Sequence, residues 1–276
     1  MIKRLFYGIG QRVKGYVSSL GRGDRLLRLV FVAVCESVTA AALIILLAKR
    51  DLTFVFTCCM TFLLVLAPVV AECASMLRMR RGLYAAVQLY MFFPLFGKCA
   101  RLYFTTLWWD KLMHLLFGAA LVLCGLCLLY RLLGEQKRGA APVLFALCFS
   151  IALAALWEMT EFCLDMLFGL DMQMDSVIHG FSSGFFDSAP GLSGTVEGIS
   201  EVIVNGSILP VGGYIDIGLI DSMLDLIVEA IGAIAASLWC IIDGGRRQPV
   251  LDMLAERGRS AAVSAQGRNE SASVNL

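Results

Sequence analysis

Six apolar runs, each long enough to cross a lipid bilayer, constrain this chain of 276 residues more than any other feature. A transmembrane helix needs about 20 consecutive, mostly apolar residues. Only 16% of the residues are charged, whereas soluble domains contain about 25%. We therefore expect an all-α fold, a polytopic membrane helix bundle of about six transmembrane helices. The expected spans are residues 27–48, 52–71, 83–104, 111–133, 142–168 and 219–242.

Basic residues are concentrated in alternate segments of the chain. They gather in the lead 1–26, in the second-to-third and fourth-to-fifth connections, and in the tail 243–276. With six spans these four segments share one side of the membrane, which the positive-inside rule makes cytoplasmic. We therefore expect a basic cytoplasmic or interfacial lead, a membrane domain over residues 27–242 and a flexible cytoplasmic tail. Both termini then lie in the cytoplasm.

The connection 169–218 is the longest one between expected spans, and it lies on the opposite, extracytoplasmic side. It carries several acidic residues but no Lys or Arg, and Val, Ile and Gly alternate loosely with polar residues over 195–217. Such alternation favours short strands, and a segment without regular structure fits as well. We expect an irregular or small-β extracytoplasmic insertion.

Charged side chains within the last three spans are the best candidates for function. A charge at the centre of a membrane costs about 2.5–3.5 kcal/mol on insertion scales, so it usually faces protein or water. Three groups occur: Asp110 and His114; Glu158, Glu161 and Asp165; Asp221, Asp225 and Glu229. At about 100° per residue, each group falls on one face of its helix. Because all three lie toward the outer ends of their spans, we expect one outward-facing acidic cavity.

The charge of this cluster has to be balanced. Asp110 and Asp221 fit helix N-termini as caps or first-turn acids, and Lys98, Arg101 and Lys111 fit as partners of part of the cluster or as the edge of an anion site. Three cations cannot neutralise the whole set, so the remainder needs protons, a divalent cation or both. Oxygen-rich ligation favours Mg²⁺ or Mn²⁺, and an imidazole favours Zn²⁺. No other cofactor is expected.

These considerations give the candidate site residues. The expected metal ligands are Asp110, His114, Glu158, Glu161, Asp165, Asp221 and Asp225. His114 and Glu158 are also the candidates for catalysis, as ligand or general base. Lys111 and Arg101 are the candidates for substrate binding.

A series of motifs runs through the same positions. It consists of Trp109-Asp110-Lys111-Leu112-Met113-His114, Trp157-Glu158-Met159-Thr160-Glu161-Phe162, Met172-Gln173, Asp221-Ser222-Met223-Leu224-Asp225-Leu226 and Gly232. The series resembles the DKxxH…WExxE…Q…DxxxD…G pattern of uncharacterised bacterial inner-membrane proteins of the YjdF type. More distantly it is similar to the VanZ-like group, named for a teicoplanin-resistance protein.

The resemblance covers residues 83–242, and the chain departs from it by a long insertion between Gln173 and Asp221. It implies a multi-pass protein of the bacterial plasma (inner) membrane. It also adds Gln173 to the candidates for substrate binding. The VanZ-like similarity implies a role near envelope lipids or cell-wall precursors.

Two function classes follow. In the first, the protein is an enzyme or binding protein for a lipid-linked or cell-envelope substrate, and the carboxylates hold a divalent cation without which they would repel an anion. In the second, the protein is a proton- or cation-coupled transporter, with a relay of carboxyl groups. The relay residues are Asp165, Asp225, Glu161, Glu158 and Glu229. A structural or accessory membrane role is the remaining alternative. Membrane lipids are the expected partners, and nucleic acid is not.

Reporter fusions test the orientation. We expect a fluorescent reporter to be active after Gly134 and a secreted phosphatase to be active after Ser193, because basic segments stay in the cytoplasm. Phosphatase activity at Gly134, or fluorescence at Ser193, rules out this topology.

Overall fold

The computed structural model of the chain describes residues 2–49, 52–75, 78–106, 108–133, 140–186 and 193–244. The expected tail from residue 245 onward and the connection at Gly134 lie outside these residues. The described chain is mostly helical. Its helices are α1 (Ile2–Ser19), α2 (Arg22–Lys49), α3 (Leu52–Ser75), α4 (Arg81–Cys99), α5 (Leu102–Thr105), α6 (Trp109–Leu133), α7 (Ala140–Phe168) and α8 (Leu219–Gly244).

Five helices among the described residues are long and apolar enough to cross a membrane. These stretches are Arg22–Ile45, Thr53–Cys73, Trp109–Leu129, Ala140–Phe168 and Leu219–Ile242. A helix pairs all of its interior N–H and C=O groups within itself, which the bilayer interior demands. Five of the six expected spans therefore correspond to such helices.

The remaining expected span, 83–104, the third in sequence, is not confirmed. Its main helix, α4, has 19 residues, with Arg81 at its start and Lys98 in its last turn. Arg101 has a left-handed φ of 58° and separates α4 from the short α5. Charged ends and a buried Gln88 make α4 less apolar than its neighbours.

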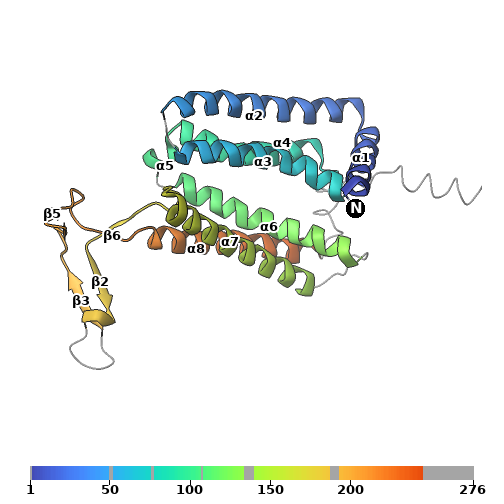
Figure 1. The fold of residues 1–276 in the computed structure, drawn as a ribbon. Coiled ribbons are helices and arrows are strands. Elements are labelled where there is room, and N and C mark those ends of the chain that lie inside the picture. The colour runs from blue at the N-terminus through green and yellow to red at the C-terminus, as the bar shows by residue number, and fades with distance from the viewer. Residues whose placement is uncertain are drawn as a thin grey trace, which may run out of the picture.

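The long helices form two layers (Figure 1). Helices α2, α3 and α4 pack against one another, and so do α6, α7 and α8. Each layer has its own apolar core. The first core contains Cys58 and Leu95 with Ala42, Leu43, Phe54 and Phe92 around them. The second core contains Val122, Leu126, Val143, Ala146, Ala233, Ala236 and Cys240.

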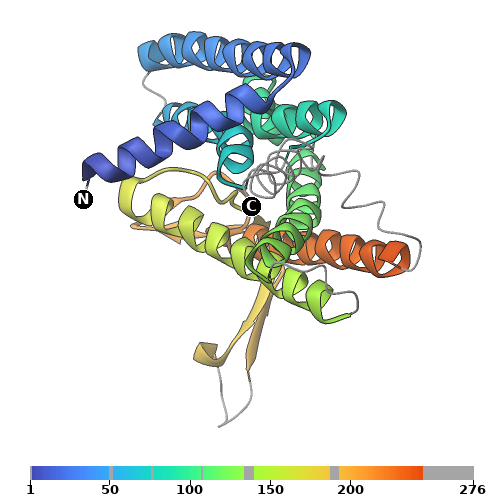
Figure 2. The same ribbon diagram turned by 90° about the vertical axis from the view of Figure 1, so that its right-hand side faces the viewer.

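Helix α1 lies across the end of the bundle at which α2 begins and α3 ends (Figures 1 and 2). Glu72 of α3 fixes it there. The Glu72 carboxylate accepts hydrogen bonds from Arg28 Nε and Nη2, each at 2.7 Å, from the Met79 backbone N–H at 2.7 Å and from the Tyr16 hydroxyl. Arg28 and Glu72 are 5% and 1% exposed. This fully paired buried acid ties α1 to the α2–α4 layer.

The segment between α7 and α8 projects from the opposite end of the bundle (Figure 1). It contains small antiparallel strand pairs, which confirms the expectation of short strands in the insertion. The pairs are β1 (Val177–Ile178) with β6 (Tyr214–Ile215), β2 (Gly180–Ser183) with β3 (Gly194–Glu197), and β4 (Ile203–Val204) with β5 (Ser207–Ile208). A 3₁₀ turn, η1 (Gly184–Phe186), follows β2. Asn205 and Gly206 join β4 to β5 with φ of 53° and 80°, as a tight hairpin turn requires.

Two glycines let α6 and α8 cross in close contact. A Cβ atom on Gly118 of α6 would overlap the backbone carbonyl of Glu229, and one on Gly232 of α8 would overlap the carbonyl of Leu115. Small residues at such crossings allow membrane helices to approach backbone to backbone. Helix α7 also contacts α6 at this crossing. The Ser150 hydroxyl of α7 donates a hydrogen bond of 2.8 Å to the Gly118 carbonyl oxygen.

Replacing Gly118 by Ala should therefore separate α6 from α8. We expect the melting temperature of the detergent-purified protein to fall by several degrees, since overpacking costs about 1–3 kcal/mol. The matched control is Gly82→Ala, because nothing lies within 4 Å of a Cβ at Gly82. Equal melting temperatures for the two variants would contradict the close crossing.

Candidate functional site

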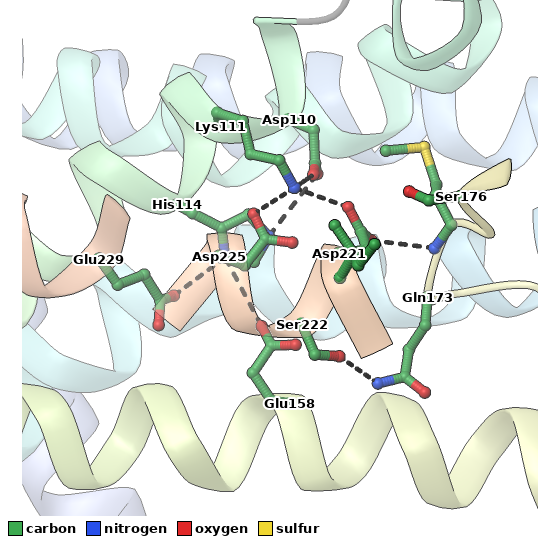
Figure 3. A network of polar contacts seen from close by, with 12 residues as sticks. Asp110, Lys111, His114, Glu158, Gln173, Ser176, Asp221, Ser222, Asp225 and Glu229 are labelled. Carbon is green, nitrogen blue, oxygen red and sulfur yellow. Dashed lines mark hydrogen bonds and ion pairs between the residues drawn. The ribbon is translucent and has the colours of Figure 1, made fainter. Parts of the chain in front are cut away.

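The first turns of α6 and α8 and the C-terminal half of α7 bring their polar side chains together (Figure 3). Asp110 and Asp221 lie in the first turns of α6 and α8, where a helix dipole favours carboxylates. A spacing of four residues then continues each polar stripe along its helix, to His114 on α6 and to Asp225 on α8. The structure thus brings the stripes of three helices to one place.

Lys111 is the counter-ion of one part of this site. Its Nζ atom lies 2.6 Å from Asp221 Oδ1, 2.8 Å from Asp225 Oδ1 and 3.1 Å from Asp110 Oδ2. The sequence predicts Lys111 as a substrate-binding residue or as the partner of part of the cluster. In the structure its ammonium group contacts three carboxylates and joins α6 to α8.

His114 is at the centre of the other part. Its Nδ1 lies 3.1 Å from Glu229 Oε1 and 3.9 Å from Glu158 Oε1. Its Nε2 lies 3.6 Å from Asp110 Oδ1 and 3.7 Å from Asp225 Oδ1. One imidazole, 9% exposed, therefore contacts or approaches carboxylates from α6, α7 and α8.

Glu158 and Glu229 are buried without enough hydrogen-bond donors. Glu158 is 5% exposed, and neither of its carboxylate oxygens has a hydrogen-bond partner among the described residues; the nearest cationic group is His114, 3.9 Å away. Glu229 is 1% exposed, and its Oε2 lacks a partner in the same part of the chain. Buried polar atoms without hydrogen-bond partners are rare in proteins, and each calls for an explanation such as a buried water, a proton, an ion or a ligand.

Two of the expected ligands, Asp165 and Asp221, accept hydrogen bonds from the segment 169–218 between α7 and α8, here called the outer segment after its expected side of the membrane. Asp165 accepts the backbone N–H groups of Met172 and Gln173, each at 2.8 Å and each on a different carboxylate oxygen. Asp221 accepts the Met174 N–H at 2.9 Å through Oδ2, while its Oδ1 contacts Lys111. Since the chain turns back just after α7, its free N–H groups reach the acids at the helix ends.

The other predicted site residues occupy different positions. Glu161 is 8% exposed and lies close enough to Glu158 and His114 to interact with them electrostatically. Gln173 borders the site, where its side-chain amide donates to the Ser222 hydroxyl. Arg101 is exposed, with its backbone preceding α5, and no contact of its side chain with the cluster is found among the described residues.

Glu229 is the site residue that the predicted ligand set lacks. The sequence places it among the relay residues but not among the metal ligands. Its spacing of four residues from Asp225 puts it on the same face of α8. This spacing is enough to predict that Glu229 lies in the site.

Two groups of three residues have the geometry to hold a metal ion. They are Asp110, His114 and Asp225, and His114, Glu158 and Glu229; in each group the ligand atoms lie within 4.8 Å of one another. The Lys111 ammonium already contacts Asp110 and Asp225, so it would compete with a cation in the first group. The second group, here named the His–Glu–Glu triad, has the unpaired oxygens.

The fold and this cluster define a multi-pass membrane protein with charged groups between three of its helices. The sequence model of a family described as "Predicted membrane protein (DUF2238)" matches residues 30–245, and the chain belongs to this family. The match includes every residue of the cluster. No curated protein and no solved structure matches the chain. The YjdF-type and VanZ-like relations stay predictions.

Removing the Lys111 ammonium should destabilise the α6–α8 contact. In Lys111→Met three carboxylates lose their shared counter-ion, and breaking a buried ion pair costs about 3–5 kcal/mol. We expect a large drop in melting temperature, or loss of monodisperse protein. Arg101→Met removes an exposed cation from the same end of the bundle and should change little. A Lys111→Met variant as stable as Arg101→Met would show that the ammonium contributes nothing to stability.

Proposed function

We propose that the His–Glu–Glu triad binds a divalent cation, and that the protein uses this cation to bind or process an anionic, lipid-linked substrate of the cell envelope. One observation carries the proposal. Glu158 is buried, neither of its carboxylate oxygens has a hydrogen-bond partner among the described residues, and it lies beside His114 and Glu229.

The balance of charge supports a bound cation. The carboxyl groups of the cluster are Asp110, Glu158, Glu161, Asp221, Asp225 and Glu229. Among the described residues that contact them, Lys111 contributes positive charge, and His114 does so only when it is protonated and therefore not a metal ligand. Lys111 contacts the three aspartates and not the glutamates. An isolated carboxylate in an apolar interior is very unfavourable. The glutamates therefore need protons or a cation.

The donor set suits a divalent metal ion. One imidazole nitrogen and two carboxylates are ligands that Zn²⁺ and Mn²⁺ accept, and Mg²⁺ accepts the oxygens. His114, Glu158 and Glu229 would hold the ion. A bound cation at this position supplies positive charge that attracts a phosphate or polarises its oxygens.

The surroundings of the triad support a lipid-linked substrate. Beside the buried face of Glu158 and Glu161, α7 carries Met159 and Phe162, which are 62% and 53% exposed. In a membrane these side chains contact acyl chains. One helix therefore separates the charged cluster from lipid, and an anionic headgroup whose acyl chains stay in the bilayer fits this arrangement.

The proposed location is the bacterial plasma (inner) membrane, with both termini in the cytoplasm and the site toward the outer leaflet. We include α4 as a sixth crossing. It lies beside α2 and α3 along the bundle (Figure 1), and its length of 19 residues corresponds to about 28 Å of helix. The distribution of basic residues supports this orientation.

Proton- or cation-coupled transport is the second candidate. Glu158 and Glu161 are both buried on one face of α7, and protonated carboxyl groups one turn apart can pass protons. The two candidates differ in whether the triad carries a metal ion at rest.

Metal binding and stability together test the proposal. We expect purified protein to carry about one equivalent of Mg, Mn or Zn, and EDTA to lower its melting temperature, because a ligand at 100 times its Kd stabilises by about 2.7 kcal/mol. Glu158→Gln should lose both the metal and the response to EDTA. Glu201→Gln, which changes an exposed acid of the outer segment, should retain both.

Protein without metal, with no response to added Mg²⁺, Mn²⁺ or Zn²⁺ and with Glu158→Gln as stable as the parent, would end the metal proposal. Proton uptake by reconstituted vesicles would then favour the transport candidate.

A further inference from the structure

The β2–β3 hairpin has one apolar and one polar face. Strand register places Phe181 opposite Val196, and Ser182 opposite Thr195. Alternation along a strand sends these two pairs to opposite faces. On the polar face the Ser182 and Thr195 hydroxyl groups share a hydrogen bond of 2.9 Å.

Aromatic rings extend the apolar face from the base of the hairpin to its far end. The Phe181 ring lies 5.2 Å from the Tyr214 ring and 5.8 Å from the Phe186 ring, measured between centroids. Phe186 is 51% exposed, and its neighbour Phe185 is 98% exposed. A phenylalanine side chain presents about 150–250 Å² of apolar surface, which water solvates poorly.

The hairpin extends across the direction of the long helices rather than along it. Figures 1 and 2 both show β2 and β3 extending past α7 and α8, at the end where α7 finishes and α8 starts. The last residues of α7, Met166, Leu167 and Phe168, are 66%, 75% and 65% exposed. Such a run marks the lipid-facing surface of a transmembrane helix. The hairpin therefore extends from the point where this surface meets the headgroups.

We propose that the β2–β3 hairpin lies on the bilayer surface at which α7 ends, and that Phe185 and Phe186 insert between headgroups and acyl chains. Aromatic and apolar side chains opposite a polar face are typical of interfacial segments. The lipid-facing surface of α7 continues directly into this contact. Because residues 169–218 contain no Lys or Arg, insertion should depend on apolar contact and not on anionic lipid.

Site-specific photocrosslinking tests this contact. The probe is p-benzoylphenylalanine, introduced in place of Phe185 in the full-length protein, which is then reconstituted in phosphatidylcholine vesicles with or without phosphatidylglycerol. Ten native cysteines make thiol labels ambiguous, whereas this ketone adds to C–H bonds of whatever it contacts. The matched control is the same probe at Thr195, which is exposed on the polar face.

We expect lipid adducts at position 185, detected by mass spectrometry, to exceed those at position 195 several-fold and to be equal in both lipid mixtures. The probe at Phe186 gives a second, independent position. Cross-linked dimers in place of lipid adducts would identify a second copy of this chain as the occupant and overturn the proposal. Equal lipid adducts at 185 and 195, or adducts that require phosphatidylglycerol, would overturn it as well.

Discussion

The close crossing of α6 and α8 is the constraint on which the charged site depends. Gly118 and Gly232 each face a backbone carbonyl of the other helix, so the two backbones can touch. Lys111 of α6 then reaches Asp221 and Asp225 of α8 at 2.6 and 2.8 Å. Attraction between charges repays the loss of hydration only at such short range. Because Gly118 and Gly232 have no side chains, the polar stripes of α6 and α8 can come into contact.

The two layers of helices use buried acids in different ways. Glu72 is bonded by Arg28, Tyr16 and the Met79 backbone, and it fixes α1 to its layer. A buried network with every group satisfied makes a structure rigid and unique. Glu158, in the other layer, has no such partners among the described residues. Glu72 therefore stabilises the fold, whereas Glu158 has carboxylate oxygens that remain available for a ligand.

The sequence predicts the helices better than their contacts. Apolar runs locate five of the membrane helices, and spacing along each helix identifies the three polar stripes. The expected span 83–104 is not confirmed: α4 ends at Cys99, and a left-handed backbone at Arg101 separates it from α5. Pairing of Lys111 with part of the cluster is one alternative that the sequence offers, but the three carboxylates that it contacts and the role of Asp165 escape prediction. The contacts of Lys111 depend on the crossing of α6 with α8. The contacts of Asp165 depend on where the chain turns after α7. Both the crossing and the turn are properties of three-dimensional packing.

The two carboxylate oxygens of Asp221 connect the outer segment to the charged cluster. One oxygen contacts the Lys111 ammonium, and the other accepts the backbone N–H of Met174. A displacement of the outer segment at Met174 therefore changes the electrostatic field that Lys111 and its aspartates create. Thermodynamic linkage makes such coupling reciprocal. If an ion binds at the cluster and the segment 169–218 binds a surface, any coupling between the two events changes both affinities by the same factor.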